Sequence, residues 1–412
     1  MTDGASGTAA RPVTPQPQAQ PKAQATASAQ PQAPPQSQPY DAIRALLRAG
    51  KNDDAIVRAS SIAIARPDDL IAKELLFDAF FQKRDWLPAL ALAEELARRA
   101  PQVARLEKAL IATLSNMKRY EQAMAQAFQY IVRHGEDLTI LDALKVAHFY
   151  TGRTEEAIRY GQRAIELRDT EAGRAPPPVT VTVPDTPPQG ANVLSFSLWG
   201  AQPFYGYGAM INLALARRLY PDWTCRFYVD ANVPRVCVAY LRDNGGEVRN
   251  IEDEYPGVGL FQRFLVMNDP AVGRFLVRDC DARLSAAEAD LVRQWIDSGH
   301  PFHVVRDHVL HNELMIGCLW GGRTDCGIDI VDLMRRYFKF GPTAKYGHDQ
   351  RMLGLMLWPL IRSRCLVHDK HYRLDGVHTV ALTDPKSHFG AGHQNLTAVL
   401  GEVEQLGIPR LL

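Results

Sequence analysis

A 34-residue period constrains the fold of this chain more than any other feature of its sequence. Four alanines recur at intervals of 34 residues, and two prolines share that spacing: Ala55, Ala89, Ala123, Ala157, Pro67 and Pro101. Each alanine lies in an apolar pattern at helical spacing and follows a turn-like segment (GKN, KRD, MKR or TGR). Small residues at a fixed period let paired helices approach closely, and neighbouring units then bury one another's apolar faces. The period therefore predicts a helical solenoid over residues 40–170.

This unit of helix, turn and helix resembles the tetratricopeptide repeat, and three full repeats with a partial fourth fit the sequence. The resemblance implies a concave surface that binds a peptide or a protein partner. A docking or dimerisation module attached to a catalytic part is the alternative. The sequence leaves both open.

Two segments have the composition of connecting chain rather than of a packed core. Residues 1–39 consist mostly of Ala, Pro, Gln, Ser and Thr, which bury too little apolar surface to offset chain entropy, so a disordered tail is expected. Residues 171–190 are rich in proline and have no helical period. They predict a semi-rigid linker.

Residues 191–412 show a different pattern, in which short apolar runs alternate with amphipathic helical stretches. Strands are expected near 192–200, 225–230, 247–251, 274–281 and 301–307, and helices near 209–219, 233–244, 260–267 and 286–298. This alternation predicts a mostly parallel sheet covered by helices, with ligands outside the carboxyl ends of the strands. The predicted fold class is a helical repeat domain followed by an α/β domain.

Composition excludes several classes of function. The formal net charge of +1 lacks the basic excess of a nucleic-acid-binding protein. There is no apolar run of the length of a membrane span and no secretory signal, so a cytoplasmic protein is expected. The six cysteines form no CxxC pair, which indicates free thiols rather than a disulfide framework or a zinc site.

The end of the fourth expected strand carries the main chemical signal. Asp279 and Asp281 lie one residue apart after an apolar run, so both carboxylates lie on one side of an extended segment. Two such oxygen donors can hold Mg²⁺ or Mn²⁺ with open positions for phosphate, as departure of a nucleoside diphosphate requires. The alternative is structural: one carboxylate pairs with Arg278 or Arg283, and the other caps the helix near Ser285.

Ten of the twelve histidines lie between His300 and His393. His368 ends a strand-like CLVH run, and we consider it as a third metal ligand, with a hydrogen-bonded structural role as the alternative. A metal-dependent hydrolase built on the histidines ranks last, because the sequence has no short HxH or HExxH motif.

Further candidates line the expected strand ends. Asp349, with Gln350, opens a helix that is expected to end at Pro359; the aspartate either caps that helix or orients an acceptor hydroxyl, positions the sugar or acts as a base. The remaining candidates are expected to contact the ribose, phosphate, base or sugar of a nucleotide ligand. The alternative is that they fill the core or form salt bridges. They are Asp230, Arg263, Arg278, Trp199, Trp320 and Gly321.

The segment from about Asn192 to Tyr372 resembles a bacterial family of glycosyltransferases with the GT-A fold. The similarity rests on YGYGAMINLALARRLYPDWTCRFYVDANVP, LFQRFLVMNDPAVGRFLVRDCDARL, FHVVRDHVLHNELMIGCLWGG and HDQRMLGLMLWPLIRSRCLVHDKHY. It implies that Asp279 and Asp281 are metal and diphosphate ligands and that His368 is a late metal-binding histidine. Asp349 and Gln350 match the active-site position of retaining, glycogenin-like relatives.

That resemblance defines the expected activity. A nucleotide sugar, most simply a UDP-sugar, donates its sugar with Mn²⁺ or Mg²⁺ to a hydroxyl of a glycan, a lipid-linked glycan or a protein. The alternative is a binding scaffold whose transferase-like domain is inactive, and it predicts that the substitutions Asp279→Asn and Asp281→Asn leave function unchanged.

Overall fold

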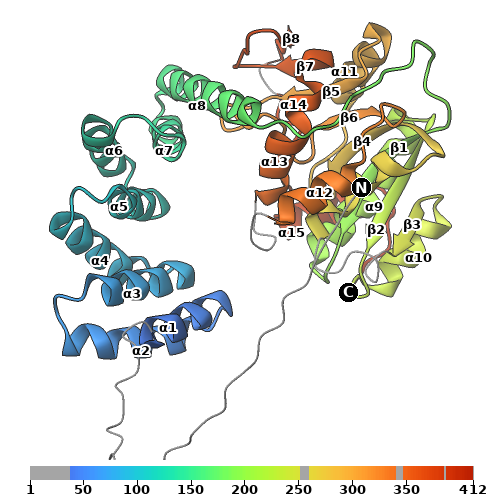
Figure 1. The fold of residues 1–412 in the computed structure, drawn as a ribbon. Helices are drawn as coiled ribbons and strands as arrows, with labels where there is room; N and C mark the ends of the chain where they lie inside the picture. Colours follow the sequence, from blue (N-terminus) through green and yellow to red (C-terminus); the bar gives the residue numbers. More distant parts are fainter. Residues whose placement is uncertain (1–37, 251–258, 340–346, 385–386, 412) are drawn as a thin grey trace, which may run out of the picture.

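The N-terminal part of the chain forms four helical pairs that stack into a solenoid (Figure 1). The computed structural model describes residues 38–250, 259–339, 347–384 and 387–411, so the expected tail lies outside the described residues except for its last two positions, which begin α1. The pairs are α1 (Gln38–Arg48) with α2 (Asn52–Ala65), α3 (Leu70–Lys83) with α4 (Trp86–Arg99), α5 (Ala104–Asn116) with α6 (Tyr120–His134), and α7 (Leu138–Tyr150) with α8 (Thr154–Arg174).

The periodic alanines explain why these helices pair. Each lies in the second helix of a pair and is at most 1% exposed, so two helices approach where a larger side chain would separate them. This confirms a helical region of tetratricopeptide-like repeats, with four pairs rather than three and a fragment. In Figure 1 the first helices of the pairs (α1, α3, α5 and α7) lie on the side of the solenoid that faces the rest of the molecule.

The C-terminal part contains one eight-stranded sheet with the order β3-β2-β1-β4-β6-β5-β7-β8. Every neighbouring pair is parallel except those made by β6, which runs antiparallel to β4 and to β5. The strands are β1 (Ala191–Leu198), β2 (Trp223–Val229), β3 (Glu247–Asn250), β4 (Val272–Asp279), β5 (Phe302–Arg306), β6 (Trp320–Arg323), β7 (Cys365–Asp369) and β8 (His378–Ala381). The predicted α/β class is confirmed.

Helices cover both faces of this sheet, because alternate strand residues point to opposite faces. Val193 and Phe275 belong to one buried cluster, whereas Leu194 and Leu276 belong to the other. The second face is covered by α9 (Pro203–Leu219), α10 (Arg235–Asp243), α11 (Ala286–Ser298) and α15 (Leu396–Gln405). The first face is covered by α8, the 3₁₀ helix η1 (Gly259–Asn268), α12 (Ile330–Lys339), α13 (His348–Met352), the π-helical turn η2 (Leu353–Leu357) and α14 (Trp358–Ile361), which a short 3₁₀ turn η3 (Arg362–Arg364) follows.

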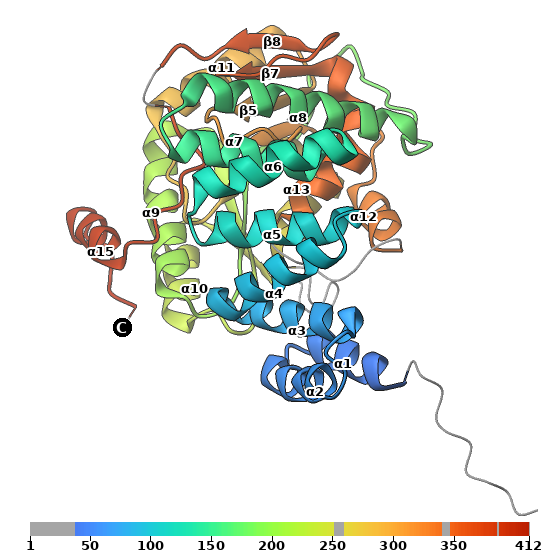
Figure 2. The same cartoon turned by 90° about the vertical axis from the view of Figure 1, so that its left-hand side faces the viewer.

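The last repeat helix, α8, belongs to both parts of the molecule. Ile165 and Ala172 lie in the core of the α/β domain, and Asp169 accepts hydrogen bonds from Trp358 Nε1 at 2.7 Å and from the Arg362 guanidinium. Figures 1 and 2 both place α8 beside the α/β domain and α1 and α2 at the opposite end of the solenoid. The fourth repeat is therefore a fixed part of the α/β domain.

The proline-rich linker is also attached. Residues 171–174 still belong to α8, and the chain that follows hydrogen-bonds along the α/β domain: Thr182 N donates to Cys326 O at 3.1 Å, and Arg323 Nη2 donates to Thr186 O at 2.7 Å. The expected semi-rigid spacer is thus held at several points by the domain that it precedes.

Three local expectations differ from the structure. The segment expected as a helix near 260–267 forms a 3₁₀ helix. The helix expected to end at Pro359 continues to Ile361. The π-helical turn before the proline changes the hydrogen-bonding pattern of the backbone, and Pro359 then lies in the first turn of α14, where its missing N–H is tolerated. Strand β6 was not expected, since its sequence, Trp-Gly-Gly-Arg, has the composition of a turn.

Candidate functional site

The order of the strands fixes where a ligand can bind. From β1 the chain moves outward to β2 and β3 and then returns to β4 on the other side of β1, so the switch point of the topology lies between β1 and β4. Ligands of open α/β sheets bind outside the carboxyl ends of the strands at such a point. A cavity of about 630 Å³ lies there, and its lining includes Ser197 to Trp199 at the end of β1 and Asp279 to Asp281 at the end of β4.

A buried asparagine shapes the turn after β4. Asn212 of α9 donates from Nδ2 to Cys280 O at 3.1 Å and Ala282 O at 2.7 Å, and its Oδ1 accepts from Leu284 N at 3.1 Å. The turn is thereby held against α9, with Asp279 and Asp281 facing the cavity.

The structural alternative for these two aspartates fails. Arg278 pairs with Glu288 instead, Arg283 pairs with Glu402, and the cap of α11 is the Ser285 hydroxyl, which accepts from Glu288 N at 3.2 Å. Asp281 Oδ2 accepts from Gln394 Nε2 at 3.0 Å, and burial raises the pKa of its carboxyl above the usual range, with Gln394 opposing that effect.

A buried arginine joins Asp279 to a second carboxylate. The guanidinium of Arg263 donates from Nη1 to Asp279 Oδ1 and, at 2.8 Å, from Nη2 to Asp349 Oδ2. Ser195 and Ser197 of β1 hold the backbone of this residue: Ser195 Oγ donates to Arg263 O at 2.6 Å, and Arg263 N donates to Ser197 Oγ at 2.8 Å. The cation therefore occupies a defined position between the two acids.

Asp349 lies in the first turn of α13 but does not cap it. The N-cap is Gly347, without a side-chain cap, and burial raises the pKa of Asp349 although Arg263 opposes this. Gly317 makes the arrangement possible, because a Cβ there would lie 2.3 Å from Asp349 Oδ2 and 3.0 Å from Arg263 Nη2. Gln350 follows Asp349 in the cavity lining.

The fourth repeat contributes one wall of the cavity. Asp142 and Lys145 of α7 and Arg168 of α8 all line it. Lys145 Nζ donates to Asn312 Oδ1 at 2.5 Å. Arg168 Nη2 donates to Asp142 Oδ2 at 2.6 Å and, across the domain junction, to Glu313 Oε1 at 2.6 Å. Burial lowers the pKa of Lys145, although the charge of Asp142 opposes this.

A wall from the C-terminal segment completes the cavity. Gly390, Gly392 and Gln394 line it, and a Cβ on Gly392 would lie 2.8 Å from Asp281 Oδ2. Sequence reasoning missed this wall, the repeat wall and Asn212. The two glycines, spaced as Gly-x-Gly in the sequence, are the one signal of close backbone approach that could have identified the C-terminal wall.

The structure brings together Trp199, Arg263, Asp279, Asp281, Asp349 and Gln350, and places the other candidates elsewhere. Asp230 forms a turn with Asn232 and accepts from Gly200 N at 3.0 Å, so it supports the loop that carries Trp199. Trp320 is 1% exposed and packs edge-on against Phe264 and Phe275, so its indole fills the core and forms no wall of the site.

Gly321, Arg278 and His368 likewise lie outside the cavity lining. A Cβ on Gly321 would lie 2.5 Å from Phe275 O, so this glycine permits β6 to pair closely with β4. Arg278 is buried and donates to Cys318 O at 3.0 Å and Phe389 O at 3.2 Å. His368 Nδ1 lies 2.8 Å from His303 Nε2, and burial lowers the pKa of His368 to about 4.

Two carboxylates in the cavity lining, those of Asp279 and Asp281, are the candidate ligands of a cation. Among the described residues no group of three or more His, Cys, Asp and Glu side chains is placed to hold a metal ion, so His368 does not join the aspartates. Mg²⁺ is commonly held by one or two carboxylates together with substrate phosphates and water. Asp279 and Asp281 supply two carboxylates, of which Asp279 Oδ1 accepts from Arg263 and Asp281 Oδ2 accepts from Gln394. All six cysteines are buried free thiols, as expected. In the described ranges, no helix has the length and apolar character needed to cross a membrane.

No protein-family model matches the sequence, and no curated protein matches it. Among solved structures, MamA from AMB-1 is similar at 19% identity, over 31% of this chain and 70% of that chain, with a TM-score of 0.30. MamA from Desulfovibrio magneticus RS-1 is similar at 17% identity over 32% and 75% (TM-score 0.31), and TTC0263, a thermophilic TPR protein of Thermus thermophilus, at 21% over 33% and 74% (TM-score 0.28). The fold and cavity define a two-part protein: tetratricopeptide-like helical repeats joined to a mostly parallel α/β domain with a ligand-sized cavity at its switch point.

Proposed function

We propose that this chain is a glycosyltransferase that moves a sugar from a nucleotide-sugar donor to a hydroxyl acceptor. One observation carries the proposal: Asp279, the last residue of β4, and Asp281, two residues later, lie at the switch point of the sheet and line a cavity of about 630 Å³. That volume lies within the usual range for small-molecule sites, roughly 300–1,000 Å³. The sequence resemblance to GT-A glycosyltransferases supports the same assignment.

The donor occupies the part of the cavity next to β1 and β4. Asp279 and Asp281 would hold Mn²⁺ or Mg²⁺, which, when bound, neutralises charge on the departing diphosphate. Arg263 is a cation fixed beside Asp279, and its positive charge would favour a diphosphate at this end of the cavity. Trp199 borders this region with a partly exposed indole, a flat apolar face for the base or the sugar. The resemblance favours a UDP-sugar as the donor, and the experiment below compares the bases.

Asp349 and Gln350 serve the reacting sugar. Asp349 faces Asp279 across the Arg263 guanidinium, so its carboxylate lies on the far side of that cation from the proposed diphosphate site. There it orients a sugar or acceptor hydroxyl, and Gln350 adds an amide donor and acceptor to the same wall. Both remain candidates for catalysis, since each lines the cavity.

A thermal-shift panel tests the donor site. UDP, GDP, CDP and their nucleotide sugars are added with and without Mn²⁺ to the wild type, to Asp279→Asn and to Asp281→Asn. A ligand that binds only the native state raises apparent stability by mass action. We expect one nucleotide to stabilise the wild type only when the metal is present, and neither variant to respond.

Asp222→Asn is the matched control, because Asp222 is an exposed aspartate of the same domain and should behave as the wild type. A nucleotide that stabilises all four proteins equally would show that the aspartates do not form the donor site. If no nucleotide shifts the wild type, the proposal fails. The alternative then gains support, in which the repeats bind a protein partner and the α/β domain is an inactive, transferase-like scaffold.

A further inference from the structure

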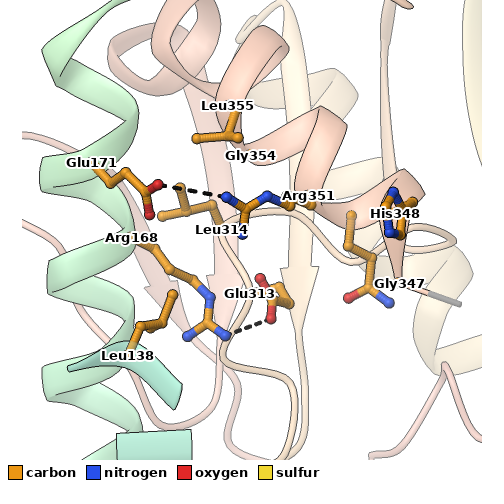
Figure 3. A pocket seen from close by; sticks show the side chains of 11 residues that line it. Leu138, Arg168, Glu171, Glu313, Leu314, Gly347, His348, Arg351, Gly354 and Leu355 are labelled. Atoms are coloured by element: carbon orange, nitrogen blue, oxygen red, sulfur yellow. Dashed lines mark hydrogen bonds and ion pairs between the residues drawn. The ribbon is translucent and has the colours of Figure 1, made fainter. Parts of the chain in front are cut away.

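A second pocket adjoins the proposed donor cavity at the junction of the two parts of the molecule. It has a volume of about 300 Å³ and lies between α8 of the fourth repeat and α13 with η2 of the α/β domain (Figure 3). Its lining shares Arg168, Glu313, Gly347 and Gln350 with the donor cavity. A group bound here therefore lies directly beside the proposed reaction centre, on the Gln350 side.

The charges of this pocket cancel in two ion pairs. Arg168 Nη2 lies 2.6 Å from Glu313 Oε1, and Arg351 Nη2 lies 3.7 Å from Glu171 Oε1. Figure 3 shows both pairs, with Arg168 and Glu171 projecting from α8 toward the α/β side. A lining with two cations and two anions favours neither an anionic nor a cationic ligand, since complementarity of charge governs such selection.

Among the other lining residues, three are leucines, and His348 and Gln350 add uncharged polar side chains on the α13 side. Leu138 of α7, Leu314 and Leu355 border the pocket together with the backbone of Gly354. A sugar ring presents the same combination of surfaces: C–H groups on its faces and hydroxyls, which both donate and accept, around its edge. Arginine donates and glutamate accepts, so the two pairs match hydroxyls while the leucines match the C–H faces.

We propose that this pocket is the acceptor subsite and that it binds one sugar residue of an uncharged glycan. The inference rests on the proposed transferase function, and it assigns the acceptor class that the donor cavity leaves open. It also gives the fourth repeat a direct role, because α8 supplies Arg168 and Glu171 as binding residues. Hydroxyl recognition at the junction makes the repeat region part of the acceptor site.

Binding of methyl glycosides to the full-length protein tests this proposal without any donor. The neutral probes are the methyl glycosides of glucose, galactose, mannose and N-acetylglucosamine, the charged probe is methyl glucuronide, and saturation-transfer NMR is the readout. We expect a neutral glycoside to bind the wild type better than the glucuronide. Substitution Gly354→Leu should weaken that binding roughly tenfold or more by filling the pocket, because a Cβ at Gly354 already reaches Leu314 Cδ1 at 3.6 Å.

Gly401→Leu is the matched control, since Gly401 lies in a helix with open space around its Cβ position and lines neither cavity. A second variant, Glu171→Gln, leaves Arg351 without its anionic partner and should move preference toward the glucuronide. This variant keeps the size of the side chain, so it reports on the pocket even if Gly354→Leu does not fold.

The outcomes separate the two proposals. Equal glycoside binding by wild type and Gly354→Leu, a wild-type preference for the glucuronide, or no glycoside binding at all would each overturn the acceptor assignment. Nucleotide binding measured on the same variants reports on the donor site alone. Glycoside binding without any nucleotide response would retain the sugar subsite and refute the transferase.

Discussion

Asp169 links the repeats to the α/β domain, and its removal is the sharpest test of whether α8 is a structural part of that domain. Its carboxylate accepts from Trp358 Nε1 at 2.7 Å, from Arg362 Nε at 3.0 Å and from Arg362 Nη2 at 2.7 Å. Trp358 is fully buried. We therefore expect Asp169→Ala to leave a buried indole N–H without an acceptor and to break a bidentate ion pair.

The magnitude follows from these two losses. An unsatisfied buried donor costs about 1–3 kcal/mol, and hydrogen bonds to a charged group contribute about 1.5–3 kcal/mol. The Arg362 side chain is 31% exposed, so solvent screening reduces the second contribution. A combined loss of roughly 2–4 kcal/mol remains, which lowers the melting temperature of a domain of roughly 200 residues by about 4–16 °C.

Calorimetric melting of the full-length protein measures this loss, and a second substitution divides it. Asp169→Asn keeps an oxygen acceptor for the indole but loses the charge, so it should show about half of the effect. Glu156→Ala, on the same helix, removes a partly exposed acid that forms only a long ion pair with Arg159, at 3.6 Å, and it should change stability by less than about 0.5 kcal/mol.

The result also bears on the acceptor pocket, because Arg168 and Glu171 flank Asp169 on α8. Asp169→Ala should weaken glycoside binding even at temperatures where the variant is fully folded. The reason is that the position of α8 sets the distance between its own pocket residues and those of α13 and η2. If Asp169→Ala melts within about 1 °C of the wild type, then α8 does not depend on this contact and the argument for a fixed junction is refuted.

Three further predictions concern the rest of the chain. Burial, with the charge of Glu74, raises the pKa of Asp78 to about 6; because the folded pKa exceeds the unfolded one, its contribution to stability is lost as pH rises from about 4 through 6. At pH 8, Asp78→Asn should therefore raise the free energy of unfolding by roughly 1 kcal/mol, after allowance for partial exposure, and so melt at a higher temperature than the wild type. A lower or equal melting temperature would contradict this. Gly321→Ala should cost roughly 1–3 kcal/mol in urea unfolding, because its Cβ would lie 2.5 Å from Phe275 O; unchanged stability would mean that β4 and β6 pair less closely. All six thiols are buried and should react with Ellman's reagent only after denaturation, so a thiol that reacts in the native protein would contradict the buried placement.

The sequence predicted the elements whose signal is local. Apolar runs and helical periodicity identified β1 to β5 and the helices between them, because each depends on side-chain spacing within a few residues. The four residues of β6 carry no such pattern. They form a strand by pairing between β4 and β5, where Phe275 and Phe302 leave no room for a Cβ at the two glycines. The strand order, and hence the switch point, follows from these long-range pairings.

The same difference between local signals and long-range pairings decides which candidate site residues were predicted correctly. Residues at the carboxyl end of a strand, such as Asp279, or directly after it, such as Trp199, reach the cavity because the ends of β1 and β4 meet there. Residues within strands were ambiguous, since the sequence gives the alternation but not which face a given side chain takes. Trp320 and His368 lie inside β6 and β7, and both point into the interior.

The repeat wall could not be predicted from helical spacing, because a lysine on an amphipathic helix normally lies in solvent. Lys145 is instead 5% exposed and bonds to Asn312 of the α/β domain, with Asp142 at 3.4 Å. A buried charge is tolerated only with such partners. Without the α/β domain, Lys145 and Asp142 would lose Asn312, and without the repeats Glu313 would lose Arg168. Each part therefore satisfies the polar groups of the other, and the wall of the cavity exists only where both are folded together.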